Sequence, residues 1–214
     1  MQEHFLSTAR TARYFTLGSS ANATDVWFVC HGYGQLAARF LERFRPLETE
    51  RRWIVAPEGL SRFYLTESPT ERRVGASWMT REDRLHEIGD YVRYLDTLHA
   101  AVLQSQARTT VLGFSQGTAT ACRWAGLGAA HIGRLILWGG EVPPDLDLAD
   151  ARIQARLSAA RLTLVYGKGD QFFPPKVVAS TESRLRDHGI GFERVEFDGG
   201  HEIDAATLLR LTEP

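Results

Sequence analysis

Short runs of β-branched and aromatic residues alternate, along this chain of 214 residues, with longer segments of helical periodicity. The run at Val26–Cys30 is apolar throughout, which is typical of a strand buried on both faces of a sheet. Five further runs are predicted to be strands: Trp53–Ala56, Thr109–Gly113, Arg134–Trp138, Leu162–Tyr166 and Arg194–Phe197. Helical segments lie at Leu36–Leu47, Arg81–Gln106, Gly117–Leu127, Ala151–Ala159 and Lys176–His188. This alternation predicts an α/β fold whose doubly wound, mostly parallel sheet has helices on both faces.

The longest helical segment and the N-terminal region give more local predictions. Apolar side chains recur along that helix at steps of three and four, at Leu85, Ile88, Val92, Leu95, Leu98 and Val102. They predict one buried stripe, and Thr80 followed by Asp83 resembles a capping box at its start. Near the N-terminus, Arg13–Leu17 is predicted to be an edge strand, and Phe5–Ala9 is a second candidate.

The segment Ser61–Ser77 fits no periodic template and is interpreted as an irregular loop. Loops of that length inside a compact domain are usually functional or mobile. The sequence shows no internal repeat and no linker, so a single domain over residues 1–214 is expected. A domain of this size leaves little chain for a cap over the site, and we expect the Ser61–Ser77 loop to cover it.

Composition argues against several classes of protein. Lys and Arg total 25 and Asp and Glu total 26, a net charge of −1 that gives no electrostatic basis for a nucleic-acid partner. No stretch approaches the ~18 apolar residues of a membrane span, so stable membrane insertion is not expected. The N-terminus lacks a signal-peptide pattern, and the widely separated Cys30 and Cys122 suggest neither a disulfide nor a zinc site. A cytoplasmic location is therefore expected.

The pentapeptide Gly113–Gly117 (GFSQG) has the pattern G-x-S-x-G. It follows the predicted strand Thr109–Gly113 and opens a predicted helix, which is the context of a nucleophilic serine. Small residues two positions on either side let the chain pass closely through a sharp, strained turn. Ser115 is therefore predicted to be a nucleophile, with the N–H of Gln116 directed at an oxyanion. The alternative is an ordinary serine in a glycine-flanked turn.

A serine nucleophile needs a base, and the base needs an orienting acid. In sites of this type the chain order is serine, acid, histidine. Asp170 follows the predicted strand Leu162–Tyr166, and His201 follows Arg194–Phe197, at the same edge of the sheet as Ser115. We predict that Asp170 is the orienting carboxylate and that His201 is the general base and acid.

Two rival residues and a second oxyanion donor complete the predicted site. Asp198 is the main rival acid, but it stands so close to His201 in sequence that a role in the turn is favoured. His31 follows a strand but precedes the serine, which favours a structural role in holding the next loop. That glycine-rich loop is predicted to supply the second oxyanion donor, the backbone N–H of Tyr33, with Gly34 as the next candidate.

Together these motifs resemble those of the α/β-hydrolases, in particular the small phospholipase/carboxylesterase branch that includes acyl-protein thioesterases and bacterial esterases. The matching motifs are His31-Gly32-x-Gly34, Gly113-Phe114-Ser115-Gln116-Gly117, Gly167-x-Gly169-Asp170 with Pro174 soon after, and Gly200-His201-Glu202. The resemblance implies an α/β-hydrolase fold with a minimal cap domain or none. It also implies a triad of Ser115, Asp170 and His201, and oxyanion N–H groups from Tyr33 and Gln116.

The activity implied is hydrolysis of a small-molecule ester or thioester through an acyl-serine, without a metal or organic cofactor. The family commonly has an aliphatic residue and an Asp where Tyr33 and Gln35 stand, and its loop differs from residues 56–77 here, so the substrate stays open. A lactonase, peptidase or acyltransferase on the same triad is an alternative, as is a non-catalytic ligand-binding protein of this fold. A homodimer is a further hypothesis on which the sequence is silent.

Substrate contacts are predicted among residues that flank the triad loops. The candidates are Tyr33, Leu65, Trp78, Phe172 and Phe173, each of which can equally belong to the core. Three cationic side chains stand in the irregular loop: Arg62, Arg72 and Arg73. They could bind an anionic substrate group, since a guanidinium presents a planar fork to oxyanions. Glu67 and Glu71 partly offset this charge, and a solvated charged face is the alternative.

Overall fold

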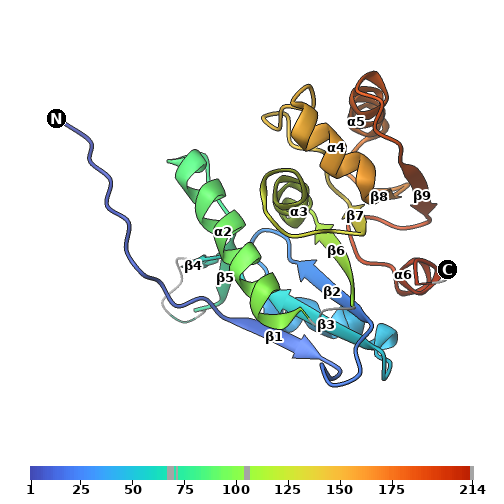
Figure 1. Ribbon diagram of the computed structural model, residues 1–214, viewed down its shortest axis with the longest axis horizontal. Coiled ribbons are helices and arrows are strands. Elements are labelled where there is room, and N and C mark those ends of the chain that lie inside the picture. Colours follow the sequence, from blue (N-terminus) through green and yellow to red (C-terminus); the bar gives the residue numbers. More distant parts are fainter. Residues whose placement is uncertain (67–69, 71, 104–106, 213–214) are drawn as a thin grey trace.

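A seven-stranded sheet lies at the centre of the molecule, with helices on both of its faces (Figure 1). The computed structural model describes residues 1–66, 70, 72–103 and 107–212. Within that part of the chain the strands of this sheet are β1 (Tyr14–Leu17), β2 (Asp25–Cys30), β3 (Arg52–Pro57), β6 (Arg108–Phe114), β7 (Arg134–Trp138), β8 (Arg161–Gly167) and β9 (Glu193–Phe197). The helices are α1 (Ala37–Leu41), the 3-10 helix η1 (Glu42–Leu47), α2 (Arg84–Val102), α3 (Gln116–Leu127), α4 (Ala151–Ala159), α5 (Pro175–Asp187) and α6 (Ala205–Arg210).

The strand order is β1-β3-β2-β6-β7-β8-β9, and every neighbouring pair from β3 onwards is parallel. Strand β1 pairs antiparallel with β3 at the edge of the sheet. Parallel neighbours need long crossover connections, which the helices supply. The predicted mostly parallel sheet is thus confirmed. Its carboxyl edge gathers the loops that follow β2, β6, β8 and β9.

The core has two layers because alternate residues of each strand face opposite sides of the sheet. In β2, Val26 and Phe28 belong to the core layer on the face that α2, α3, α4 and α5 cover, and the ring of Phe28 lies 5.3 Å from that of Trp124 in α3. Trp27 and Val29 belong to the core layer on the other face, which also contains apolar side chains of α1, η1 and α6 (Figure 1). A strand enclosed in this way has no polar face, which accounts for the unbroken apolar run in its sequence. Among the described residues, no helix combines the length and apolarity that a membrane span requires.

The prediction that Ser61–Ser77 is irregular was wrong at both of its ends. Its described ends are the strands β4 (Ser61–Tyr64) and β5 (Val74–Ser77), which form an antiparallel hairpin apart from the main sheet. Each of the two strands has four residues, SRFY in β4 and VGAS in β5, and neither sequence alternates polar and apolar residues, so no periodic pattern shows. The middle of the segment, including Glu67 and Glu71, lies outside the described residues.

The start of α2 also differs from its prediction. Asp83 precedes the helix with a left-handed φ of 47° and makes no side-chain cap. The N–H of Thr80 donates instead to Glu87 Oε2 at 2.6 Å. Leu85 is 74% exposed, so the buried stripe begins one turn later, at Ile88. The predicted capping box and the first position of the stripe were therefore wrong, because the left-handed residue shifts where the helix begins.

Three further differences concern short elements. Residues 5–9 form no strand; they run beside α2, where the ring of Phe5 lies 4.4 Å from that of His86. The predicted helix Leu36–Leu47 changes from α1 to the 3-10 helix η1, whose Pro46 cannot donate to an α-helical turn. The helix α6 was not predicted; Asp204 caps it by accepting from Thr207 N at 2.7 Å.

Candidate active site

Ser115 stands in a strained turn between β6 and α3, with a φ of 56° that non-glycine residues rarely adopt. The chain passes so closely here that a Cβ at Gly113 would lie 2.2 Å from the carbonyl oxygen of Gly117. A Cβ at Gly117 would lie 2.1 Å from the carbonyl oxygen of Cys30 in β2. Both positions therefore require glycine, and the turn lifts Ser115 to the carboxyl edge of the sheet.

The structure brings together three side chains that are far apart in sequence. Nε2 of His201 lies 2.9 Å from Ser115 Oγ, and its Nδ1 lies 2.8 Å from Asp170 Oδ2. The other carboxylate oxygen of Asp170 accepts hydrogen bonds from the backbone N–H groups of Phe172 and Phe173, at 2.9 and 3.2 Å. Asp170 is thus held by its own loop while it contacts the histidine, and the three residues form one continuous hydrogen-bonded chain.

Aromatic rings enclose the imidazole of His201 within this chain. The ring of Phe114 lies 4.9 Å away, that of Phe172 4.8 Å, and that of Phe173 is stacked at 5.7 Å. The Asp170 side chain is only 1% exposed, whereas that of His201 is 19% exposed. Solvent is therefore excluded from the carboxylate but reaches the histidine. Phe172 itself is 72% exposed, so its ring can contact a substrate beside His201.

The rival acid and the other strand-end histidine have different partners. Asp198 forms an ion pair of 2.7 Å with Lys168, and its side chain is 87% exposed. Nδ1 of His31 lies 2.8 Å from the carbonyl oxygen of Gly32, and its Nε2 accepts from the N–H of Gly59 at 2.9 Å. Burial lowers the pKa of His31, so the ring is neutral and carries its proton on Nδ1. His31 thus holds the glycine-rich loop.

Two backbone N–H groups next to Ser115 lack a hydrogen-bond partner in the described part of the chain, those of Tyr33 and Gln116. The N–H of Gly34, the alternative donor, is already engaged with the carbonyl oxygen of Ala76 at 2.9 Å. The Tyr33 loop adjoins the serine, because a Cβ at Gly32 would lie 3.1 Å from Ser115 Cβ. The geometry therefore leaves Tyr33 and Gln116 free to donate to a bound oxygen atom.

The side chain of Gln116 has a role that the sequence did not reveal. Its Nε2 donates to the carbonyl oxygen of Met79 at 2.8 Å, and its Oε1 accepts from the N–H of Trp78 at 3.1 Å. It also bonds to Ser77 Oγ at 3.1 Å. Gln116 therefore ties the turn at Ser115 to the segment that follows β5. A glutamine inside the G-x-S-x-G pattern was the only available signal.

Trp78 was predicted to contact substrate, but the structure buries it. The residue is 2% exposed, and its indole N–H donates to the carbonyl oxygen of His31 at 2.9 Å. Its ring also stacks on that of His31, with centroids 5.1 Å apart. Trp78 therefore supports the loop before Tyr33, and the small part of its surface that stays open lines the larger cavity beside α2. The structure favours the core alternative for Trp78, which the sequence could not distinguish because its partner, His31, belongs to a distant strand end.

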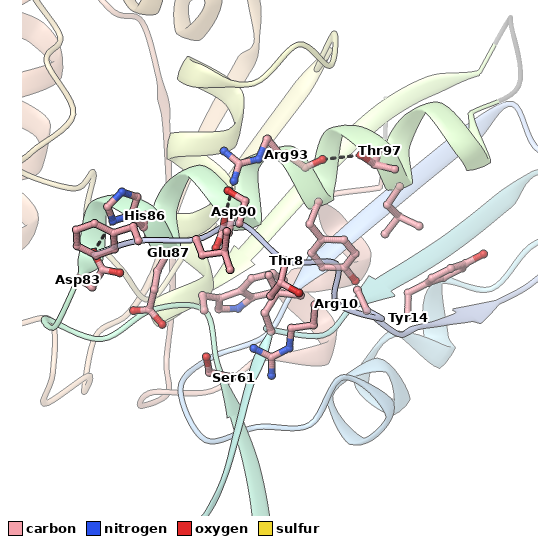
Figure 2. Close-up of a pocket in the computed structure, with 18 of the residues that line it drawn as sticks. Thr8, Arg10, Tyr14, Ser61, Asp83, His86, Glu87, Asp90, Arg93 and Thr97 are labelled. Atoms are coloured by element: carbon pink, nitrogen blue, oxygen red, sulfur yellow. Dashed lines mark hydrogen bonds and ion pairs between the residues drawn. The ribbon is translucent and has the colours of Figure 1, made fainter. Parts of the chain in front are cut away.

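The predicted cationic cluster is divided between different surroundings. Arg62 donates to the buried carboxylate of Glu58 at 3.1 Å. Arg72 and Arg73 are both exposed, but only Arg73 lines a cavity of about 270 Å³, together with Leu65. A larger cavity of about 1150 Å³ lies between the N-terminal segment and α2 (Figure 2), and none of the Ser115, His201 and Asp170 side chains lines it. The hydrogen-bonded chain of Ser115, His201 and Asp170 therefore lies apart from the larger cavity.

Glu58 connects the elements that surround the glycine-rich loop. Its carboxylate accepts from Arg13 Nε at 2.6 Å, from Arg62 Nη1 at 3.1 Å and from the N–H of Ala37 at 3.2 Å. Burial alone would raise the pKa of Glu58, but the hydrogen bonds from Arg13 and Arg62 outweigh it and hold the pKa below its ordinary value. The carboxylate is therefore ionised at neutral pH.

Replacing this carboxylate, as in Glu58→Gln, is expected to lower the free energy of unfolding by about 2 kcal/mol at pH 7, because charge-assisted hydrogen bonds are lost. The native pKa is below the unfolded one, so the unfolded state binds the proton more readily. Glu58 therefore stabilises the fold above its ordinary pKa of about 4.3, and this contribution is lost as pH falls through the native pKa. Urea unfolding of both proteins between pH 3 and pH 7 measures it. Glu48→Gln, at an exposed glutamate, is the control; equal stabilities throughout would contradict the prediction.

Comparisons with known proteins show the family and the fold of the chain. Residues 28–207 match the sequence profile of the family described as serine hydrolase (FSH1). The chain belongs to this serine hydrolase family. No curated protein sequence matches it. Within the described residues, no group of three His, Cys, Asp or Glu side chains is placed to hold a metal ion.

Solved structures establish the fold. The crystal structure of acyl-protein thioesterase 2 from Zea mays matches with a TM-score of 0.72 and 16% identity, over 94% of this chain and 96% of that one. A carboxylesterase from Mesorhizobium loti matches with a TM-score of 0.70 and 20% identity, over 95% of each chain. Esterase PE8 matches with a TM-score of 0.67 and 21% identity, over 95% of this chain and 100% of that one. The predicted α/β-hydrolase fold is confirmed, and the described residues include no large cap domain.

Proposed function

We propose that this serine hydrolase cleaves small-molecule carboxylic esters or thioesters through a covalent acyl intermediate on Ser115. The observation that carries the proposal is the hydrogen-bonded chain from Asp170 through His201 to Ser115 Oγ. The unpartnered N–H groups of Tyr33 and Gln116 next to it add to the argument. The solved structures of similar fold include proteins named esterase and thioesterase, which favours acyl transfer to water over other uses of the fold.

In the first half of the proposed reaction, His201 Nε2 removes the hydroxyl proton as Ser115 Oγ attacks the carbonyl carbon. The Asp170 carboxylate holds the imidazole in the Nδ1–H tautomer and stabilises the imidazolium that forms. The N–H groups of Tyr33 and Gln116 donate to the tetrahedral oxyanion, and each such donor contributes on the order of 3 kcal/mol. The C–O or C–S bond then breaks, and the leaving group takes the proton from His201.

Water completes the reaction. His201 removes a proton from a water molecule as its oxygen attacks the acyl carbon, and the proton returns to Ser115 Oγ when the acid departs. The 19% exposure of the His201 side chain gives water access to it in the acyl-enzyme, which favours hydrolysis over acyl transfer to another acceptor. The free, buried cysteines Cys30 and Cys122 are compatible with a cytoplasmic place of action.

A fluorophosphonate probe tests this proposal, because it reacts covalently only with a serine that a base activates. We expect intact-mass spectrometry to show one adduct, and peptide mapping to place it on Ser115. Ser61, a partly exposed hydroxyl in β4, serves as the internal comparison within the same digest. No adduct would instead favour the non-catalytic ligand-binding protein, and an adduct on another serine would assign the nucleophile to that residue in place of Ser115.

A further inference from the structure

The cavity of about 270 Å³ lies between the helical segment α1–η1 and the hairpin β4–β5. Three arginines line this cavity: Arg39 of α1, Arg43 of η1, and Arg73, which directly precedes β5. No Asp or Glu among the described residues lines it, and Phe40 and Leu65 provide apolar wall. Three exposed arginines from two separate parts of the chain therefore line one small concave space.

This cavity adjoins the proposed catalytic site through the glycine-rich loop. Gly34 and Gln35, which follow Tyr33, form part of its wall. Gln35 Oε1 accepts from the N–H of Gly32 at 2.8 Å, and Gly32 in turn lies against Ser115. Two residues of chain span roughly 7 Å at most, so the cavity wall begins within a short substrate's length of the serine.

The three guanidinium groups have no ion-pair partner within the part of the chain that the structure describes. The neighbouring carboxylates there are engaged elsewhere: Glu42 pairs with Arg45, and Glu58 is bound by Arg13 and Arg62. Like charges that share a concave surface raise its positive potential and favour an anion. A guanidinium also presents paired N–H donors that match the oxygens of a carboxylate or phosphate.

We propose that Arg39, Arg43 and Arg73 form a subsite for an oxyanion group, a carboxylate or a phosphate, carried by the ester substrate. The inference deepens the proposed function and rests on it. The ester bond would lie at Ser115 while the anionic end of the same molecule occupies the cavity beyond Gly34. The preferred substrates would then be monoesters of dicarboxylic acids, or esters bearing a phosphate.

The test compares two 4-nitrophenyl esters of matched shape, the anionic hemisuccinate and the neutral 4-methylpentanoate. For the wild-type protein we expect the higher kcat/KM with the hemisuccinate. The triple variant Arg39→Gln/Arg43→Gln/Arg73→Gln is expected to lower the ratio of the two kcat/KM values by about tenfold or more, since charge-assisted hydrogen bonds are lost. The kcat/KM of the neutral ester, which should stay within about twofold of wild type, reports that the variant is folded.

Arg72→Gln is the matched control, because Arg72 neighbours Arg73 but does not line the cavity. The Arg72→Gln variant should leave the ratio of the two kcat/KM values unchanged. If the triple variant does not fold, Arg73→Gln alone replaces it in the test, and we expect that variant to lower the ratio about threefold. Competition by succinate and by inorganic phosphate distinguishes the two anions. A second pair of substrates, the acetyl esters of 4-hydroxybenzoate and of 4-methylphenol, carries the anionic or neutral group on the leaving group. Comparing their kcat/KM values shows whether the enzyme prefers the charge there or on the acyl group.

The outcomes separate the two hypotheses. Ser115-dependent hydrolysis of the neutral ester, with ratios that the arginine variants leave unchanged in both ester series, would overturn the subsite and leave the proposed function standing. Absence of hydrolysis of every ester would overturn both. A loss of anion preference in Arg72→Gln equal to that in the triple variant would mean that general surface charge, rather than the cavity, attracts the anion.

Discussion

Ser115→Ala is expected to lower kcat/KM for 4-nitrophenyl acetate by a factor on the order of 10⁴ or more, because the covalent route is lost. Alanine keeps the Cβ and so retains the backbone strain of the turn, in which φ is 56°. The hydroxyl is therefore the only group removed. Steady-state assays at several enzyme concentrations measure the change, and circular dichroism checks that the fold is retained.

A residual rate would not by itself contradict the assignment. The N–H groups of Tyr33 and Gln116 stay in place, and an intact oxyanion site alone accelerates hydrolysis over water by about 10³. Full activity in the alanine variant would contradict it. The active-site titre from the initial burst of 4-nitrophenol, which should be lost in Ser115→Ala, separates the acyl-serine route from direct attack by water.

A second large effect is expected for Asp170→Asn, with kcat reduced about 10⁴-fold. The asparagine Oδ1 can still accept from the N–H groups of Phe172 and Phe173, so the loop is preserved. Its NH2 group, however, would donate to Nδ1 of His201 and so place the histidine proton on Nε2. That nitrogen could then no longer accept the proton of Ser115. Because this defect lies in the tautomer, kcat should fall far more than KM rises.

Asp198→Asn is the control for this prediction, since Asp198 is the rival acid closest in sequence to His201. Its side chain is exposed and pairs only with Lys168 among the described residues, so kcat should stay within about twofold of wild type. The reverse pattern, a small effect at position 170 and a large one at 198, would move the orienting role to Asp198. The pH profile of kcat in each variant shows which of the two carboxylates, that of Asp170 or that of Asp198, controls the ability of His201 to accept the Ser115 proton.

Sequence patterns were sufficient for the parts of the molecule that depend on single strands. Ser115, Asp170 and His201 each follow an apolar run whose end the pattern marks, and parallel strands bring such ends to one edge. The close approaches at Gly113 and Gly117 explain why the G-x-S-x-G pattern carries structural information. The roles of the three residues stay predictions until variants are measured, but their proximity is a property of the fold.

Other features could not be predicted because they depend on contacts between distant segments. The burial of Trp78 follows from its bond to His31, 47 residues away. Arg39 and Arg43 belong to a helical segment whose exposed side carries ordinary charges, and only the placement of the hairpin brings Arg73 to the same cavity. Nothing in the sequence pairs β4 with β5, since short strands without strict alternation resemble a loop.

The exposed side chain of Tyr33 has a consequence for how this site can diversify. In the proposed mechanism position 33 contributes through its main-chain N–H, which every residue except proline supplies. Its side chain has no part in that contact: Tyr33 is 60% exposed, and its ring lies 5.1 Å from the tilted ring of Phe63 in the hairpin. Mutational drift or directed evolution can therefore change the side chain next to the nucleophile without removing the oxyanion donor. Position 33 is thus a suitable first choice for a library that aims at new esters.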